Sequence, residues 1–202
     1  MAITNGYCTL AELKAALRVA DSIDDSLLEL AIESASREID GYCERVFYST
    51  SGTRVYAPTN VYYMNTDDIV SVTTLKSSSD GVTYDTTWTA SDYQLEPLNG
   101  VAGGLTGHPA TRIRAVGDYL LPAWATGTIY NLEASMQVVG VFGWSAIPAA
   151  VRQATVILAM RIFKRLDAPL GMITNDMGSM RVGRFDPDVE ALVMPFRKVS
   201  AG

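Results

Sequence analysis

Apolar residues recur at helical spacing along the first fifty residues of the chain. Leu10 and Leu13 begin this pattern, and they follow Thr9 in the segment Thr9-Leu-Ala-Glu12, which has the form of a capping box. An acidic break from Asp21 to Asp25 then precedes a second apolar stripe made of Leu27, Leu28, Ala31, Ile32, Ala35, Ile39 and Tyr42. The pattern predicts a short helix, a tight acidic turn and a longer helix that ends between Cys43 and Phe47.

Short runs rich in Val, Tyr and Thr replace the helical spacing from about Ser49 onward. Residues typical of turns separate these runs, which is the pattern of strands joined by loops. The predicted strands are Arg54–Ala57, Ile69–Leu75, Val82–Thr87, Thr111–Val116, Thr128–Leu132 and Met136–Phe142. Ser79-Asp80-Gly81 predicts a hairpin turn, and Gly100–Gly107 predicts a flexible hairpin loop. We therefore expect twisted β structure from Ser51 to Trp144.

Helical spacing returns after Pro148, which we expect at the first position of a helix over Ala149–Leu166. The middle of this helix, Ala154–Met160, carries no charge on any face, so it must be covered on several sides. The cover could be the first helical pair, the β-rich segment or a neighbouring subunit. A final short helix is predicted to begin at Asp186-Pro187-Asp188.

These elements predict an α+β fold. A helical core formed by residues 1–50 and 145–202 carries a β-rich lobe inserted at residues 51–144, within a single domain of 202 residues.

Composition and charge narrow the possible functions. Hydrophobic residues make up 48% of the chain and charged residues 19%, which is a globular composition, and the net charge is −6. A protein that grips nucleic acid by its phosphates needs a basic face, so the acidic balance argues against that role. No apolar run approaches the roughly 18 residues of a membrane-spanning helix. The first six residues lack the features of a signal peptide, so we expect folding in a cytoplasm.

The sequence contains no recognisable catalytic or metal-binding motif. The single histidine, His108, lies in a loop before Pro109, and Gly100–Gly107 lacks the Gly-Lys-Ser/Thr ending of a phosphate-binding loop. Cys8 and Cys43 are expected to be free and to pack as small apolar residues. Three acidic clusters lack calcium-loop spacing, and we interpret two of them, Asp21/Asp24/Asp25 and Asp186/Asp188, as helix caps and Asp67/Asp68 as a turn before a strand. We therefore predict no enzyme activity, no cofactor and no metal.

The segment Gly171–Gly183 has no clear period, and we predict a mobile arm there. Its methionines, together with nearby arginine and phenylalanine residues, suit docking on a partner protein. An ordinary loop that folds back on its own core is the alternative, and composition alone leaves both open.

Two patterns resemble the head–tail connector (adaptor) proteins of long-tailed bacteriophages. The first is the N-terminal helical pair, which ends on Asp-Gly-Tyr-Cys-Glu-Arg45-Val-Phe47. The second is Val141-Phe-Gly-Trp144, the Pro148-initiated helix with Arg165 and Pro169-Leu-Gly171, and the closing Asp186-Pro-Asp-Val…Leu192-Val-Met-Pro-Phe-Arg197. The simplest members of that family are nearly all helical, so the β-rich insertion departs from the pattern.

The resemblance implies a structural virion protein at the head–tail junction, assembled in the host cytoplasm. Such a protein forms a ring, typically of twelve copies, under the portal protein, and it docks a stopper or other tail-side neck protein. Genome DNA passes through the ring without sequence-specific binding, and no membrane is involved. The predicted portal-binding residues are Met180, Arg181, Arg184, Phe185, Met194, Phe196 and Arg197.

Two other functions remain open at this stage. A head-closure (stopper) or tail-terminator protein would have the same location but more β structure. A β-rich module that binds carbohydrate or a host surface could instead use an aromatic platform made of Tyr56, Tyr62, Tyr63, Tyr84, Trp88, Tyr93 and Trp124. Aromatic residues in strands more often serve packing.

Overall fold

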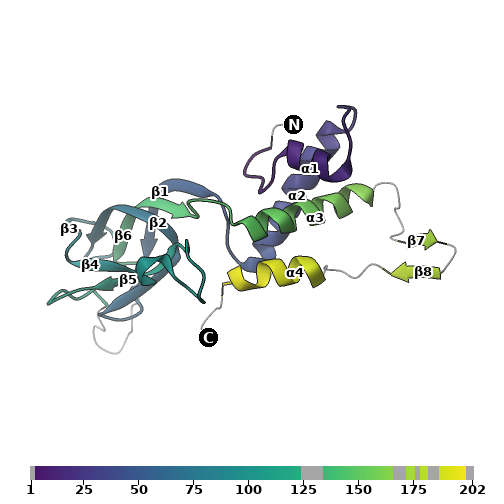
Figure 1. The fold of residues 1–202 in the computed structure, drawn as a ribbon. Helices are drawn as coiled ribbons and strands as arrows, with labels where there is room; N and C mark the ends of the chain where they lie inside the picture. Colours follow the sequence, from purple (N-terminus) through teal and green to yellow (C-terminus); the bar gives the residue numbers. More distant parts are fainter. Residues whose placement is uncertain (1–2, 124–133, 166–171, 176–177, 182–186, 199–202) are drawn as a thin grey trace. The chain divides into compact units, whose positions relative to one another are not determined.

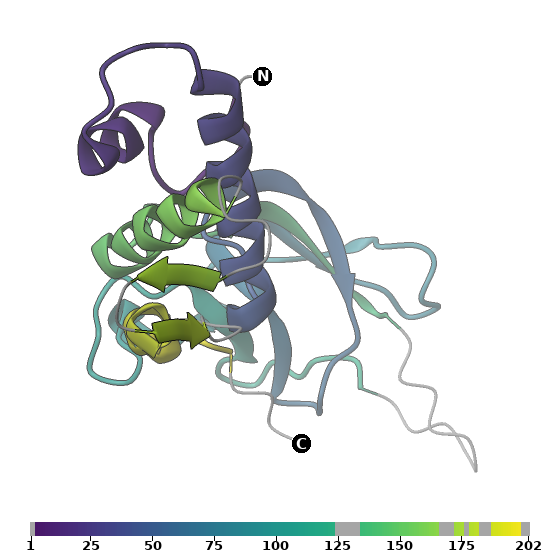
Figure 2. The ribbon, with the colours of Figure 1, turned by 90° about the vertical axis from the view of Figure 1, so that its right-hand side faces the viewer.

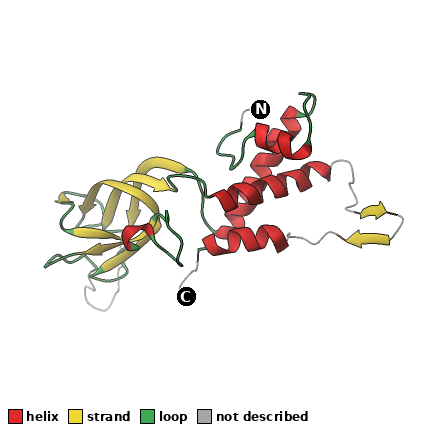
Figure 3. Ribbon diagram, in the orientation of Figure 1, coloured by secondary structure: helices red, strands yellow, loops and turns green. Residues whose placement is uncertain are grey.

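The chain divides into two compact units. The computed structural model describes residues 3–123, 134–165, 172–175, 178–181 and 187–198. One unit is Tyr48–Ala146, and the other combines the flanking segments Met1–Phe47 and Ile147–Gly202. Among the described residues, strands dominate the inner unit, whereas the four α-helices all belong to the flanking unit, which we call the helical unit (Figure 3). The predicted α+β class, including the N-terminal helical pair, is confirmed.

The N-terminal pair consists of α1 (Leu10–Leu17) and α2 (Asp25–Cys43), drawn in purple and blue in Figure 1. The capping box is present, because the Glu12 amide donates to Thr9 Oγ1 at 3.2 Å and the Thr9 amide donates to Glu12 Oε2 at 2.7 Å. A salt bridge of 2.6 Å between Lys14 Nζ and Asp25 Oδ1 joins the two helices across the acidic turn.

One face of α2 packs against α3 (Ala149–Lys164). The buried positions of α2 are Leu28, Ala31, Ile32, Ala35, Ser36, Ile39 and Cys43. Leu27, which we expected on this face, is 42% exposed, because the buried stripe is centred one position later. Pro148 occupies the N-cap of α3 and not its first helical position, since its extended ψ of 143° precedes the first turn.

The end of the chain returns to the same unit. Helix α4 (Pro187–Val193) contacts α3 and continues into the short 3₁₀ helix η2 (Met194–Phe196), as Figure 2 shows in yellow beside green. The Phe196 ring meets Phe47 edge-on, with centroids 6.0 Å apart, and the Lys198 amide donates to the Cys43 carbonyl at 2.8 Å. The C-terminal segment therefore closes over the last turn of α2.

The segment expected to be an irregular arm contains a strand pair. Strands β7 (Met172–Asn175) and β8 (Gly178–Arg181) are antiparallel, with Asn175 paired to Gly178. Met-Ile-Thr at 172–174 has high strand propensity, which favours this pairing. Strands of this length are too short to show the alternation of apolar and polar residues by which a longer strand is predicted.

The inner unit is a six-stranded antiparallel sheet in the order β1-β6-β2-β5-β4, with β3 also paired to β2. The strands are β1 (Ser49–Tyr56), β2 (Tyr63–Ser77), β3 (Thr86–Trp88), β4 (Tyr93–Glu96), β5 (Ala110–Ala115) and β6 (Met136–Gly143). Register shifts within β2 bend this long strand, so its first half pairs with β5 and its second half with β6 and β3. The core consists of Met64, Ile69, Leu75, Trp88, Ala110, Ile113, Leu121, Met136, Val138 and Phe142.

Two glycines allow β6 to lie between β1 and β2. A Cβ added at Gly140 would stand 2.2 Å from the Ser71 carbonyl oxygen, so no side chain fits there. Gly143 has a φ of +99°, and a Cβ there would stand 1.9 Å from the Tyr48 carbonyl oxygen.

The strand predictions are correct in part. The strands predicted at Ile69–Leu75, Thr111–Val116 and Met136–Phe142 are present, and that at Arg54–Ala57 begins earlier, at Ser49. Thr128–Leu132 lies outside the described residues. The prediction over Val82–Thr87 is wrong for most of its length, because Asp80 organises a polar loop by accepting from the Val82 and Thr83 amides at 2.9 and 2.7 Å. Strand β4 was not predicted.

The Asp67/Asp68 pair does not form a turn before a strand, because it lies inside β2. Asp67 accepts from Arg54 Nη1 at 2.7 Å and from the Tyr56 hydroxyl at 3.0 Å. Asp68 is buried and accepts from the Trp144 indole at 3.0 Å. These donors come from other parts of the unit, so local spacing could not reveal that the two carboxylates would accept hydrogen bonds from distant residues.

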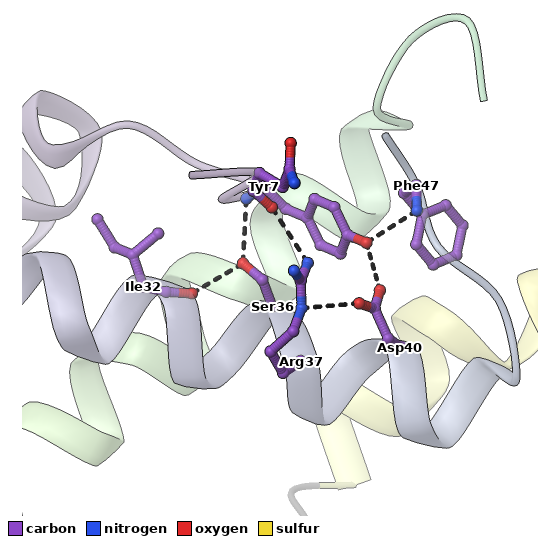
Figure 4. A network of polar contacts seen from close by, with 7 residues as sticks. Tyr7, Ile32, Ser36, Arg37, Asp40 and Phe47 are labelled. Atoms are coloured by element: carbon purple, nitrogen blue, oxygen red, sulfur yellow. Dashed lines mark hydrogen bonds and ion pairs between the residues drawn. The ribbon is translucent and has the colours of Figure 1, made fainter. Parts of the chain in front are cut away.

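A buried phenol joins three segments of the helical unit (Figure 4). The Tyr7 hydroxyl donates to Asp40 of α2 and accepts from the Phe47 amide at 2.8 Å, while the Tyr7 amide donates to Ser36 Oγ at 3.1 Å. Arg37 Nε lies 2.8 Å from Asp40 and its guanidinium donates to the Asn5 carbonyl. Burial, followed by the hydrogen bond to Asp40, raises the pKa of Tyr7 far above its ordinary value, so the hydroxyl stays a donor.

We expect Tyr7→Phe to lower the free energy of unfolding by about 1–3 kcal/mol, because it removes the hydroxyl that accepts from the Phe47 amide and donates to Asp40. Urea unfolding of the variant measures the loss. Tyr42→Phe is the matched control, since it removes an exposed hydroxyl that donates to Glu190 at 2.9 Å, and its effect should stay within about 0.5 kcal/mol. Equal losses in the two variants would contradict the role assigned to Tyr7.

The contact between Phe196 and Phe47 supports a second prediction. Phe196→Ala should cost about 3 kcal/mol in unfolding free energy, because it opens a cavity under η2. Met194→Ala, two residues earlier, removes a side chain that is 64% exposed and should cost no more than about 0.5 kcal/mol. Both values come from urea unfolding, and a Phe196→Ala variant as stable as Met194→Ala would show that the C-terminal segment does not contribute to the helical core.

Candidate docking surfaces

The predicted portal-binding residues fall into three structural settings. Met180 and Arg181 lie in β8, where the backbone but not the side chains is described. Arg184 and Phe185 lie outside the described residues. Met194, Phe196 and Arg197 lie at the end of the chain, in or directly after η2. The structure therefore brings only the last three together.

These three residues have different surroundings. Phe196 is buried against Phe47, whereas Met194 is one of the most exposed large apolar side chains of the described helical unit. Arg197 lies over the Tyr42 ring with 5.6 Å between its guanidinium and the ring centroid, and its Nη2 is 3.9 Å from Glu44 Oε1. Phe196 thus fixes η2 to the core, and Met194 and Arg197 remain at the surface beside it.

Sequence reasoning missed a second exposed apolar group, at the start of α2. Ile23 is 86% exposed and Leu30 is 53% exposed, and Leu27 lies between them in the sequence. A helical projection could have indicated Leu30, because it lies outside the buried stripe of α2. Whether Ile23 and Leu27 are covered depends on where α1 packs, and that is a tertiary property.

The aromatic residues of the inner unit do not form a common platform. Trp88 is buried and donates from its indole to Ser77 Oγ at 2.9 Å, and the Tyr84 hydroxyl donates to the Ala134 carbonyl at 2.5 Å. Tyr56 is bonded to Asp67, and the Arg112 guanidinium lies 4.5 Å from the Tyr63 ring centroid. Trp124 lies outside the described residues. Tyr56, Tyr63, Tyr84 and Trp88 therefore take part in packing and hydrogen bonding, whereas Tyr62 is 59% exposed.

A hollow of about 330 Å³ opens beside Trp88. Three serines, Thr86 and Thr87 line it together with Asp92, Tyr119 and Leu120. Asp92 already accepts from the Thr89 amide at 2.6 Å and from Ser91, so its carboxylate is engaged within its own loop. The described lining consists largely of hydroxyl groups, and that of Ser78 donates to Asp80 Oδ1 at 2.7 Å.

The two cysteines of the helical unit have low reactivity. Cys8 and Cys43 are free and buried, and burial raises the pKa of each thiol to about 12. Both therefore stay protonated at neutral pH and are poor nucleophiles.

Within the described ranges, no three His, Cys, Asp or Glu side chains are arranged to hold a metal ion. In the same residues, no helix is both long and apolar enough to cross a membrane.

Residues 7–83 match the family of phage gp6-like head-tail connector proteins. This segment contains α1 and α2, the Tyr7 network, β1 and β2. No curated protein is significantly similar to the chain in sequence.

The fold is shared with solved chains from gene transfer agent (GTA) particles. A chain in the neck of an empty GTA particle, computed with C6 symmetry, is 22% identical with a TM-score of 0.58. A chain in the neck of a native GTA particle, computed with C12 symmetry, is 20% identical with a TM-score of 0.57, and one in the virion of a native GTA particle is 20% identical with a TM-score of 0.55. Each likeness covers 100% of this chain and 96% of the other.

The β-rich unit that departs from the simplest connectors is therefore part of the shared fold, because these matches extend over the whole chain. Family match and fold together support a structural protein of a phage neck. The resemblance to phage head–tail connector proteins is thereby confirmed, and in sequence it rests on residues 7–83.

Proposed function

We propose that the chain is a head–tail connector that forms a ring beneath the portal vertex of a phage or phage-like particle. The ring extends the DNA channel and presents a docking surface to tail-side neck proteins. The observation that carries this proposal is the connector-family match over residues 7–83. The fold shared with neck chains computed with C12 and C6 symmetry supports a ring of related symmetry.

The physical properties of the chain suit this role. A net charge of −6 disfavours tight binding to DNA that must pass through the channel. A connector also needs no catalytic group, so the proposal makes the protein structural and not enzymatic. Its place in the virion and its assembly in the host cytoplasm belong to the same proposal.

We place the portal contact on the C-terminal segment. Met194 and Arg197 are the described candidates, because both side chains lie at the surface on either side of the buried Phe196. Met180, Arg181, Arg184 and Phe185 remain predicted contacts earlier in the same segment. Phe196 then has a supporting role, since it holds η2 on Phe47.

The test is to mix the purified chain with the portal protein of the same genome and examine the portals by negative-stain electron microscopy. A second ring on the portal is the expected result. Portals that stay bare at a large excess of the chain would contradict the connector role and favour a stopper or tail terminator.

Point variants locate the contact better than removal of the tail, because Val189, Val193 and Phe196 belong to the buried core and truncation would expose it. Met194→Asp should reduce the fraction of decorated portals at least tenfold, since it places a charge in the contact. Val82→Asp is the matched control, because Val82 is 80% exposed in the inner unit and far from η2 in the sequence. Equal decoration by the two variants would place the portal contact elsewhere.

A further inference from the structure

An exposed apolar stripe runs along the start of α2. Leu27 and Leu30 are 42% and 53% exposed, and their spacing of three residues aligns them on one side of α2. Ile23, four residues before Leu27, is 86% exposed and lies in the turn just before the helix begins. The buried positions Leu28, Ile32 and Ile39 lie on the other side. We call Ile23, Leu27 and Leu30 the α2 stripe.

A second apolar stripe lies on α3. Val156, Met160 and Phe163 have the same spacing of four and three residues, and all three side chains are only partly buried. They lie on the side of the helix opposite its buried positions, Val151, Ala154, Thr155, Leu158 and Ala159. We call Val156, Met160 and Phe163 the α3 stripe, and it accounts for apolar residues of this helix that lie outside its buried face.

The two stripes have opposite charges around them. The segment from Asp21 to Glu33 contains five acidic residues, Asp21, Asp24, Asp25, Glu29 and Glu33, and no lysine or arginine. Helix α3 contains Arg152, Arg161 and Lys164 and no acidic residue, and Arg165 follows at its C-cap. Contact between an α2 stripe and an α3 stripe would therefore join apolar centres whose surrounding charges attract. Contact between two α2 stripes, or between two α3 stripes, would instead bring like charges together.

We propose that the α2 stripe of one copy of the chain packs on the α3 stripe of the next copy. This proposal rests on the ring proposed above and assigns the surface by which neighbouring copies meet. Two different surfaces on one chain make a head-to-tail contact, which closes into a ring when the rotation between copies is constant. Within each copy α2 and α3 pack on each other and α3 also contacts α1 and α4, while the side chains of both stripes keep part of their surface exposed.

Disulfide cross-linking tests the proposed pairing. The double variant Leu30→Cys with Met160→Cys should give a ladder of oligomers on mild oxidation, because each copy then offers one thiol to each neighbour. Leu30→Cys alone and Met160→Cys alone should stay uncross-linked, since equal positions do not meet in a head-to-tail contact. The native cysteines should not interfere, because both are buried and their thiol pKa values are about 12.

Val82→Cys with Met160→Cys is the control, because Val82 is 80% exposed but belongs to neither stripe, and it should give no ladder. Every variant is oxidised alone and after addition of the portal protein, and electron microscopy records ring formation in the same samples. Rings without a ladder in the double variant, or a dimer formed by Leu30→Cys alone, would overturn the pairing and leave the connector role intact. If neither the wild-type chain nor any variant forms a ring in either condition, the connector role fails and the pairing fails with it.

Discussion

The helical unit depends on the burial of one tyrosine hydroxyl. Tyr7 lies before the first helix, yet its hydroxyl bridges Asp40 near the end of α2 and the amide of Phe47, where the chain leaves the unit. Burial raises the pKa of the Asp40 carboxyl, and the hydrogen bond from Tyr7 and the charge of Arg37 act in the opposite direction. The hydrogen bonds among Tyr7, Asp40 and the Phe47 amide offset the free-energy cost of burying these polar groups, so the loss of one group weakens the others.

The same junction extends to the end of the chain through aromatic packing. Phe47 meets the Tyr7 ring edge-on at 5.6 Å and the Phe196 ring at 6.0 Å. The N-terminal segment, the last turn of α2 and η2 therefore share one small core. The C-terminal surface that we propose for portal docking is held in place by the residues that stabilise the helical pair.

The function that we propose for this protein depends on its surfaces and not on reactive side chains. The titratable groups whose pKa values shift most, Tyr7 and the two cysteines, are shifted chiefly by burial, and each shift keeps the group neutral. The exposed apolar side chains of α2 and η2 and the partly exposed ones of α3 are costly in a free monomer. The contacts that we propose with neighbouring copies and with the portal protein would cover such residues.

The sequence by itself determined the helices and much of the sheet. Thr9 and Glu12 sit three residues apart and needed no distant partner to cap α1, and the apolar spacing of α2 and α3 reflects the helical period. The strands over Ile69–Leu75 and Met136–Phe142 were also predictable, because their residues have high strand propensity. The connector resemblance followed from the order of these local patterns.

Only the tertiary structure decided what depends on distant partners. Asp67 and Asp68 became part of β2 because Arg54, Tyr56 and Trp144 supply donors from elsewhere in the unit. Phe196 and Met194 look alike as apolar residues of one segment, yet Phe47 covers the first and nothing among the described residues buries the second. Local spacing specifies hydrogen bonds that close within a few residues, whereas burial is set by whichever segment packs on top, and no single segment contains that information.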